Sequence, residues 1–212
     1  MQLSVVDRKK WKGKGKCDIL IQTKIQTEKV GISHMELKET RVETSTVYNG
    51  VIVRVELDRA ELPNGRLARR EVVRHPGGVA ILPLDAQDRA ITVRQFRYPF
   101  YTVVSEVPAG KLEAGEDPRE AAVRELSEEV GVTAGEMVYL GSMYPSPGFC
   151  DEELHMYLAL DLTEGACHPD PDEFLEVERV PFDELVARIM RNEVRDGKTI
   201  STVLKAKEYL KR

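Results

Sequence analysis

Three glutamates lie close together in the middle of the chain, at a spacing that suits cation binding. If the segment is helical, Glu125, Glu128 and Glu129 fall within roughly 100° of arc. Carboxylates on adjacent turns repel one another and weaken a helix. Mg²⁺ offsets this repulsion, since it takes oxygen ligands and usually binds through few carboxylates together with substrate phosphates. The pattern therefore indicates either metal-assisted phosphate chemistry or an acidic, solvated helix face.

The residues around the glutamates predict where this helix begins and ends. Asp117 is a good N-cap, Pro118 suits the first helical position, and Glu120 has the spacing of a capping box. Gly131 supplies a C-terminal stop. Arg124 falls beside Glu128. On another side of the helix we expect an apolar face made of Ala122, Val123, Leu126 and Val130.

The segment GKLEAGEDPREAAVRELSEEVGV resembles the Nudix box, the signature of the Nudix hydrolase family. The resemblance implies an α+β protein with the Nudix fold, a mixed β-sheet flanked by helices as an α/β/α sandwich, with an N-terminal antiparallel sheet. It also implies Mg²⁺-dependent hydrolysis of a nucleoside diphosphate linked to another moiety, and Mn²⁺ stays open as an alternative metal. Every specified position of the box matches: Gly110, Glu116, Arg124, Glu125, Leu126, Glu128, Glu129, Gly131 and Val132.

The same resemblance implies roles for the residues of the box. Arg124 would hold the glutamates in place, and Glu116 would orient the loop or reach the outer shell of the metal. Glu128 would be a further metal ligand or the base that orients water. The implied metal ligands are Glu125, Glu129, Glu128 and the backbone carbonyl of Ala109, just before the box.

Outside the box, residues 40–210 resemble the ADP-ribose pyrophosphatase branch of the family. The similarity is carried by Glu-Val-Pro-Ala-Gly-Lys at 106–111, Ser-Pro-Gly at 146–148, the basic strand at 69–73 and an arginine at 97. The branch implies hydrolysis of ADP-ribose, and of other ADP-sugars, to AMP and ribose 5-phosphate. The implied substrate-binding residues are Arg70, Glu71, Arg97, Pro147 and Gly148. Taken singly, the arginines could be surface residues and the proline a simple turn residue.

The catalytic base of this branch is a glutamate on a late loop, and the stretch at 170–177 matches it loosely. We choose Glu173, with Asp172 second and a solvated acidic loop as the alternative. His155 and His168 are expected in surface or core roles instead. The predicted catalytic residues are thus Glu173, Glu128 and Arg124.

The elements that position these residues are mostly strands. Period-two or β-branched patterns predict strands at 47–57, 69–73, 79–84, 90–96, 137–143, 154–160 and 176–180, with a hairpin turn at 62–66. Helical spacing recurs at 182–190 and 200–210. Because strands and helices do not alternate regularly, an α+β class is favoured. We expect an N-terminal sheet segment at 35–78 and the hydrolase domain at 79–212.

Residues 1–34 form a separate N-terminal extension that contains a basic run at 8–16. The run is either an arm for nucleic acid or, more simply, a solvated tail. The extension is expected to be flexible or foreign to the natural protein, because Met35 is a plausible start. The resemblance to the ADP-ribose pyrophosphatase branch implies a homodimer in which the segment at about 40–75 crosses to the partner. That crossing would bring Arg70 into the neighbour's pocket.

The 212-residue composition is that of a globular protein, with 42% hydrophobic and 32% charged residues. A formal net charge of −5 disfavours a general nucleic-acid binder. Cys17, Cys150 and Cys167 form no pair or cluster, which favours a reducing, cytoplasmic location without a zinc site. No apolar run is long enough for the membrane. The remaining alternatives are hydrolysis of a nucleoside triphosphate or dinucleoside polyphosphate, and a non-catalytic ADP-ribose-binding protein.

Overall fold

The computed structural model describes residues 36–168 and 173–211. The chain divides into two units, Met1–Glu36 and Leu37–Arg212, and all the elements below belong to the second. The expectations for residues 1–34, for Cys17 and for Asp172 fall outside the described residues. None of the described helices is long and apolar enough to cross a membrane.

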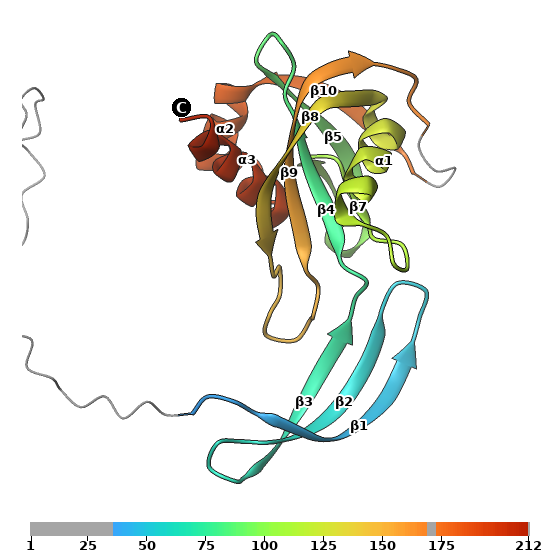
Figure 1. The fold of residues 1–212 in the computed structure, drawn as a ribbon, viewed down its shortest axis with the longest axis vertical. Coiled ribbons are helices and arrows are strands. Elements are labelled where there is room, and N and C mark those ends of the chain that lie inside the picture. The colour runs from blue at the N-terminus through green and yellow to red at the C-terminus, as the bar shows by residue number, and fades with distance from the viewer. Residues whose placement is uncertain (1–35, 169–172, 212) are drawn as a thin grey trace, which may run out of the picture. The chain divides into compact units, whose positions relative to one another are not determined.

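The N-terminal part of the described chain is a three-stranded antiparallel sheet in the order β1-β2-β3 (Figure 1). Its strands are β1 (Thr40–Asn49), β2 (Arg54–Glu61) and β3 (Leu67–Arg74). The predicted turn at 62–66 is present, with Gly65 at φ 77°. The single strand predicted at 47–57 is wrong, because a turn at 50–53 separates β1 from β2. The β-branched run at 51–53 concealed this break, which the Gly50 N–H closes on the carbonyl of Val53.

Two further sheets form the central layer of the molecule. One has the order β7-β4-β9-β8 and the other β10-β5-β6. Because β4 and β9 are parallel and the other pairs antiparallel, the predicted mixed sheet is confirmed. The strands are β4 (Gly78–Pro83), β5 (Arg89–Arg97), β6 (Thr102–Glu106), β7 (Ala109–Lys111), β8 (Val132–Met143), β9 (Leu154–Glu164) and β10 (Leu175–Pro181). A short 3₁₀ turn, Tyr98–Phe100, joins β5 to β6.

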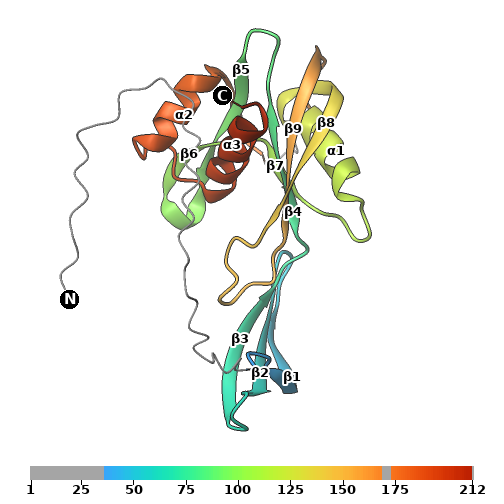
Figure 2. The same cartoon turned by 60° about the vertical axis from the view of Figure 1, so that its left-hand side comes forward.

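Helices cover both faces of this layer (Figures 1 and 2). The helix α1 (Pro118–Val130) lies on one face, and α2 (Phe182–Met190) with α3 (Gly197–Tyr209) lies on the other. Alternate residues of the buried strand β4 serve the two cores, as the period of a strand requires. Val79 and Ile81 pack in the α1 core, whereas Ala80 and Leu82 pack in the α2–α3 core. The expected α/β/α arrangement is therefore confirmed.

The helix α1 begins and ends where the sequence predicts. The Asp117 side chain accepts hydrogen bonds from the backbone N–H groups of Arg119 and Glu120, and Gly131 ends the helix at φ 64°. Its apolar face differs in one position from the prediction. Ala122, Leu126 and Val130 are buried, but Val123 is exposed and Ala121 is buried instead. The buried stripe is rotated by part of a turn, which also draws Glu125 and Glu129 inward.

Candidate active site

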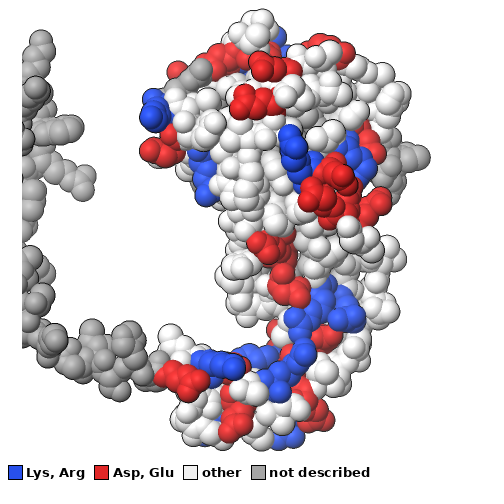
Figure 3. Space-filling view, in the orientation of Figure 1, with Lys and Arg blue, Asp and Glu red and all other residues white. Residues whose placement is uncertain are grey.

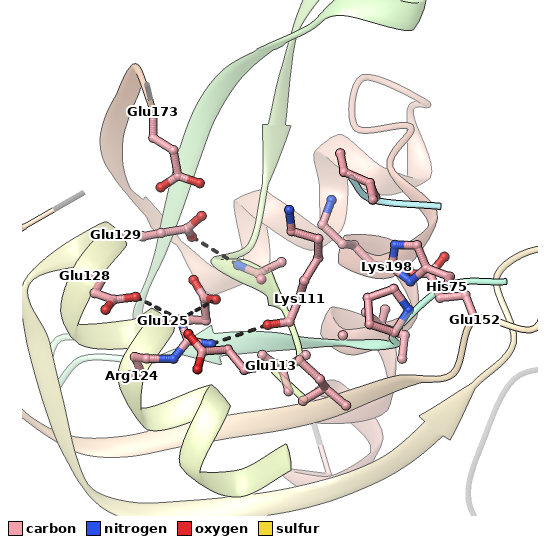
Figure 4. A pocket seen from close by; sticks show the side chains of 18 of the residues that line it. His75, Lys111, Glu113, Arg124, Glu125, Glu128, Glu129, Glu152, Glu173 and Lys198 are labelled. Atoms are coloured by element: carbon pink, nitrogen blue, oxygen red, sulfur yellow. Dashed lines mark hydrogen bonds and ion pairs between the residues drawn. The ribbon is translucent and has the colours of Figure 1, made fainter. Parts of the chain in front are cut away.

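Arg124 is the centre of the glutamate cluster on α1 (Figure 4). Its Nε and Nη2 donate to the two carboxylate oxygens of Glu116, at 2.9 and 3.1 Å. Its Nη1 donates to Glu125 Oε1 at 2.8 Å and to Glu128 Oε2 at 2.9 Å. One guanidinium thus holds three carboxylates, because it offers five donors in a planar fork. The structure thus brings Arg124 into contact with the glutamates that the sequence predicted it would hold.

Glu129 is the most deeply buried carboxylate of this helix, with 3% of its surface exposed. Its Oε2 accepts the backbone N–H of Ala109 at 3.0 Å. Burial raises the pKa of Glu129 to about 8, and the charges of Glu125 and Glu173 act in the same direction. Burial also raises the pKa of Glu125. Both groups would hold their negative charge more easily beside a cation.

Gly110 provides the room in which the Glu125 carboxylate lies. A Cβ at position 110 would overlap Glu125 Oε1, well inside any van der Waals contact. Gly110 is not among the glycines with positive φ, so the requirement here is one of space rather than of backbone conformation. The first glycine of the box therefore allows the β7 backbone and the α1 carboxylate to approach closely.

The cluster suits Mg²⁺ through a small number of protein ligands. Among the described residues, no three acidic, histidine or cysteine side chains converge to form a metal site by themselves. Mg²⁺ rarely needs such a cage, because it keeps several waters and binds through one or two carboxylates plus substrate phosphates. Glu125 and Glu129, two inward-facing carboxylates with raised pKa, match that donor set. The Glu129–Ala109 hydrogen bond also brings the backbone of Ala109 to the same place.

The glutamates line one part of a cavity of about 750 Å³, a size that suits a small-molecule ligand. Glu173 lines it as well, from the segment before β10. Besides Arg124, the cationic residues Arg97, Lys111 and Lys198 line the cavity. The remaining wall includes His75, whose Nδ1 lies 3.8 Å from Glu152 Oε1. It also includes the apolar residues Val51, Ile52, Pro76, Val79, Leu112 and Leu154. The cavity thus combines acidic, basic and apolar surfaces.

Arg97, expected at the diphosphate, lies in this cavity, and sequence reasoning missed the residues that hold it. Its Nε and Nη2 each donate at 2.7 Å to the carboxylate of Glu106. Lys198 Nζ contacts the same carboxylate. The motif at 106–111 contains Glu106 and the cavity residue Lys111, so a place in this motif was the signal that could have identified both. Lys198 carries no comparable signal, since it lies 92 residues from Glu106.

The other predicted substrate residues do not line the cavity of their own chain. Arg70 pairs with Glu39 at 2.6 Å on the N-terminal sheet, and Glu71 is exposed on the same strand. Pro147 and Gly148 lie in the β8–β9 loop, outside the cavity wall. Acidic and basic side chains are interspersed over the sheet β1-β2-β3 on the face seen in Figure 3, rather than gathered in one basic patch.

Neither histidine that was considered as a base lines the cavity. His155 lies beside Tyr139, whose hydroxyl is 3.2 Å from His155 Nδ1. The backbone N–H of His168 donates to the carbonyl of Glu128 at 3.0 Å. The thiol of Cys167 donates to the carbonyls of Glu128 and Glu129 at 3.1 Å. The loop after β9 is therefore fastened to the C-terminal end of α1.

Comparison with known proteins identifies a matching family model, relatives of similar sequence and a solved structure of similar fold. The model of the NUDIX domain matches residues 74–202. The methanol dehydrogenase activator of Bacillus methanolicus is 40% identical over 178 residues, 82% of this chain and 96% of that protein. The ADP-ribose pyrophosphatase of Bacillus subtilis (strain 168) is 39% identical with the same coverage. A crystal structure of an ADP compounds hydrolase superposes with a TM-score of 0.72 at 25% identity, covering 83% of this chain and 96% of that one.

Proposed function

Because this chain belongs to the NUDIX family and is a Nudix hydrolase, we propose that it hydrolyses the diphosphate bond of ADP-ribose to give AMP and ribose 5-phosphate. The relative named ADP-ribose pyrophosphatase supports the substrate, since it is 39% identical over 96% of its length. The solved structure named ADP compounds hydrolase supports the ADP part. The proposal extends to other ADP-sugars as further substrates of the same site.

The observation that carries the proposal is the composition of the cavity. Inward-facing glutamates on α1 and the cations Arg97 and Lys198 line the same space as the apolar residues Val51 and Ile52. A diphosphate needs both a metal and cations around its oxygens, whereas a nucleoside needs apolar surface. A nucleoside diphosphate linked to a second group is the substrate class that uses all three surfaces.

Mg²⁺ would be held by Glu125 and Glu129, with the carbonyl of Ala109 and Glu128 as further ligands. When bound, the metal polarises the diphosphate, neutralises developing charge and lowers the pKa of bound water. Arg124 keeps the glutamates in register, because its guanidinium bonds to Glu116, Glu125 and Glu128 at once. Without it, the like charges would push the side chains apart.

Glu173 is the residue we assign as the base that takes a proton from the attacking water. It lines the cavity with the α1 glutamates, and its charge contributes to the raised pKa of both Glu125 and Glu129. A general base must lie within reach of the attacking water, and the position of Glu173 on the cavity wall beside the α1 glutamates meets that requirement. Glu128 is the alternative base, although its Oε2 already accepts a hydrogen bond from Arg124.

We also propose a homodimer in which the sheet β1-β2-β3 completes the partner's site. All ten residues of β1 are exposed, including the apolar side chains of Val42, Val47 and Tyr48. Arg70 and Glu71 lie on this sheet and do not line the cavity of their own chain. A second copy would cover the apolar positions and supply Arg70 to a neighbouring substrate.

Mixing two inactive variants tests the dimer. Glu129→Gln removes a metal ligand, and Arg70→Ala removes the residue that would act in the partner. If Arg70 acts across the interface, a mixed dimer contains one intact site, so mixing the variants restores activity. If Arg70 acts within its own chain, or if the protein sediments as a monomer at full activity, mixing restores nothing and the dimer proposal is wrong.

Direct product analysis tests the substrate. The protein is incubated with ADP-ribose and Mg²⁺, and AMP and ribose 5-phosphate are identified by mass spectrometry. A nucleoside triphosphate and a dinucleoside polyphosphate serve as comparison substrates. Faster cleavage of either comparison compound would overturn the substrate assignment, and tight binding of ADP-ribose without products would indicate a binding protein. A direct test is needed because the name of one relative, the methanol dehydrogenase activator of Bacillus methanolicus, specifies no substrate.

A further inference from the structure

The side chains of Arg97, Glu106, Lys198 and Asp196 form a cluster beside the cavity, at the ends of β5 and β6 and the start of α3. Glu106 is 1% exposed, and both its carboxylate oxygens accept hydrogen bonds from Arg97. Lys198 Nζ contacts Glu106 Oε2 and donates to Asp196 Oδ1 at 3.0 Å. Two cations and two carboxylates make the cluster formally neutral.

Asp196 is fixed independently of this cluster. It is the N-cap of α3, and its Oδ2 accepts from the backbone N–H of Thr199 at 2.9 Å and from the Thr199 hydroxyl at 2.6 Å. The Thr199 hydroxyl oxygen in turn accepts the backbone N–H of Val107, next to Glu106. Both carboxylates that hold Lys198 are therefore anchored, which fixes the position of its ammonium group.

Lys198 has a donor that neither carboxylate takes. An ammonium group carries three N–H bonds, and Glu106 and Asp196 account for two of them. By tetrahedral geometry, the third N–H is directed away from both carboxylates. Lys198 lines the cavity together with Glu125 and Glu129, and in Figure 4 it extends into the space across from the α1 glutamates. Its side chain is 17% exposed, so water competes weakly for this donor.

The ion pair with Glu106 does not by itself account for Lys198. Arg97 already bonds to both oxygens of Glu106, so a second cation is not needed to satisfy that carboxylate. A fixed donor in a partly dry cavity is worth more to an anion than a mobile surface lysine, because it needs no reorganisation when the anion arrives.

We propose that Lys198 is a specificity-determining residue that donates to the diphosphate of the substrate, so that the site prefers a diphosphate to a monophosphate. This inference rests on the proposed function. A diphosphate has anionic oxygens on both phosphorus atoms, and the α1 glutamates with their cation serve one part of it. Lys198, on the other side of the cavity, serves the rest. After cleavage, a monophosphate loses one of the two anchors, which favours release of the product.

Binding of two non-reacting nucleotides tests the inference without relying on turnover. Calorimetry with Mg²⁺ compares α,β-methylene-ADP, a non-cleavable diphosphate, with AMP. In Lys198→Met we expect the diphosphate to bind about tenfold more weakly, the loss of about one charged hydrogen bond, while AMP changes less than twofold. Lys198→Arg should recover most of the diphosphate affinity. Lys205→Met, at an exposed position of the same helix, is the matched control and should bind both like the wild type.

The outcomes separate a binding role from a structural one. Equal affinity of Lys198→Met and wild type for the diphosphate would overturn the inference. So would an equal loss for both nucleotides together with a lower thermal midpoint, which indicates a structural role. If the Met variant does not fold, Lys198→Gln, which keeps a donor for Glu106 without the charge, takes its place. If the wild type discriminates as expected but releases no AMP from ADP-ribose, the proposed function fails while the diphosphate site stands.

Discussion

Two buried glutamates line or adjoin the same cavity and yet have opposite electrostatic environments. Glu106 is surrounded by cations, because Arg97 and Lys198 both contact its carboxylate. Glu129 is almost as deeply buried, but the hydrogen bond that the structure gives its carboxylate comes from a backbone N–H. Burial raises the pKa of Glu129 to about 8. Burial also acts to raise the pKa of Glu106, but the Arg97 hydrogen bonds and the Lys198 charge outweigh it and lower that pKa.

The difference separates a carboxylate that is ion-paired within the protein from one that has no ion-pair partner among the described residues. A buried charge is costly unless it is paired. Glu106 is paired within the chain, so its charge supports the fold and orients neighbours. Glu129 is not paired in that way, so its charge becomes favourable only when a cation is supplied. The predictions below follow from this contrast.

Glu129→Gln should show the largest effect. Removing a principal metal ligand is expected to lower kcat by about 10³-fold, the upper range for loss of one electrostatic group in an active site. The thermal midpoint should stay the same or rise, because a neutral amide replaces a buried carboxylate. Steady-state kinetics and thermal unfolding measure the two. Retained turnover in the variant would overturn the metal assignment.

Glu173→Gln should reduce kcat by about 10²-fold, since general-base catalysis contributes at least that factor. KM should change little, because the residue acts on water rather than on substrate binding. Glu128→Gln is the informative comparison. If it loses much more activity than Glu173→Gln, the base is on α1, and the assignment of Glu173 is wrong.

Glu106→Gln should reduce the stability of the fold. Removing this carboxylate charge leaves Arg97 without its counter-charge and Lys198 with Asp196 alone, which costs about 3 kcal/mol. Chemical denaturation of this variant measures the loss. Glu136→Gln, at an exposed position on β8, is the control and should stay within about 0.5 kcal/mol of the wild type. If Glu106→Gln were as stable as the wild type, the Glu106 charge would not support the fold, and the proposed difference from Glu129 would be wrong.

Mg²⁺ should stabilise the wild type and not Glu129→Gln. A ligand that binds only the folded state raises the thermal midpoint, by about 2–4 °C for each kcal/mol in a chain of this size. Differential scanning fluorimetry with and without Mg²⁺ tests this directly. Equal shifts in both proteins would mean that the cation binds elsewhere.

The smallest effect concerns acid stability at Glu106. Its pKa is lowered in the folded state, so its charge stabilises the fold above the unfolded pKa, about 4.3 for glutamate. That contribution is lost as pH falls through the folded pKa. The stability difference between wild type and Glu106→Gln should thus be constant above about pH 5 and shrink in stronger acid. Denaturation midpoints from pH 7 to 3 provide the measurement, and a difference that grows in acid would contradict it.

The parts of the molecule that the sequence predicts well are those governed by local interactions. The bounds of α1 follow from Asp117 and Gly131, residues whose caps act within a few positions. The turn at 50–53 was missed, although Asn49-Gly50 is a strong hairpin-turn pair, because the strand propensity of the β-branched run at 51–53 outweighed it. Lys198 was missed because its partner Glu106 is distant in the chain, and no short-range pattern records such a contact.

The position of the Glu125 carboxylate depends on the absence of a side chain at Gly110. Alanine is compatible with the backbone there, and the end of a flexible glutamate can turn aside at little energetic cost. A Gly110→Ala variant should therefore fold and resist denaturation like the wild type. Its Glu125 carboxylate would nevertheless be displaced. Screens that score only folding would pass such a chain, and only an assay of its chemistry would reveal the defect.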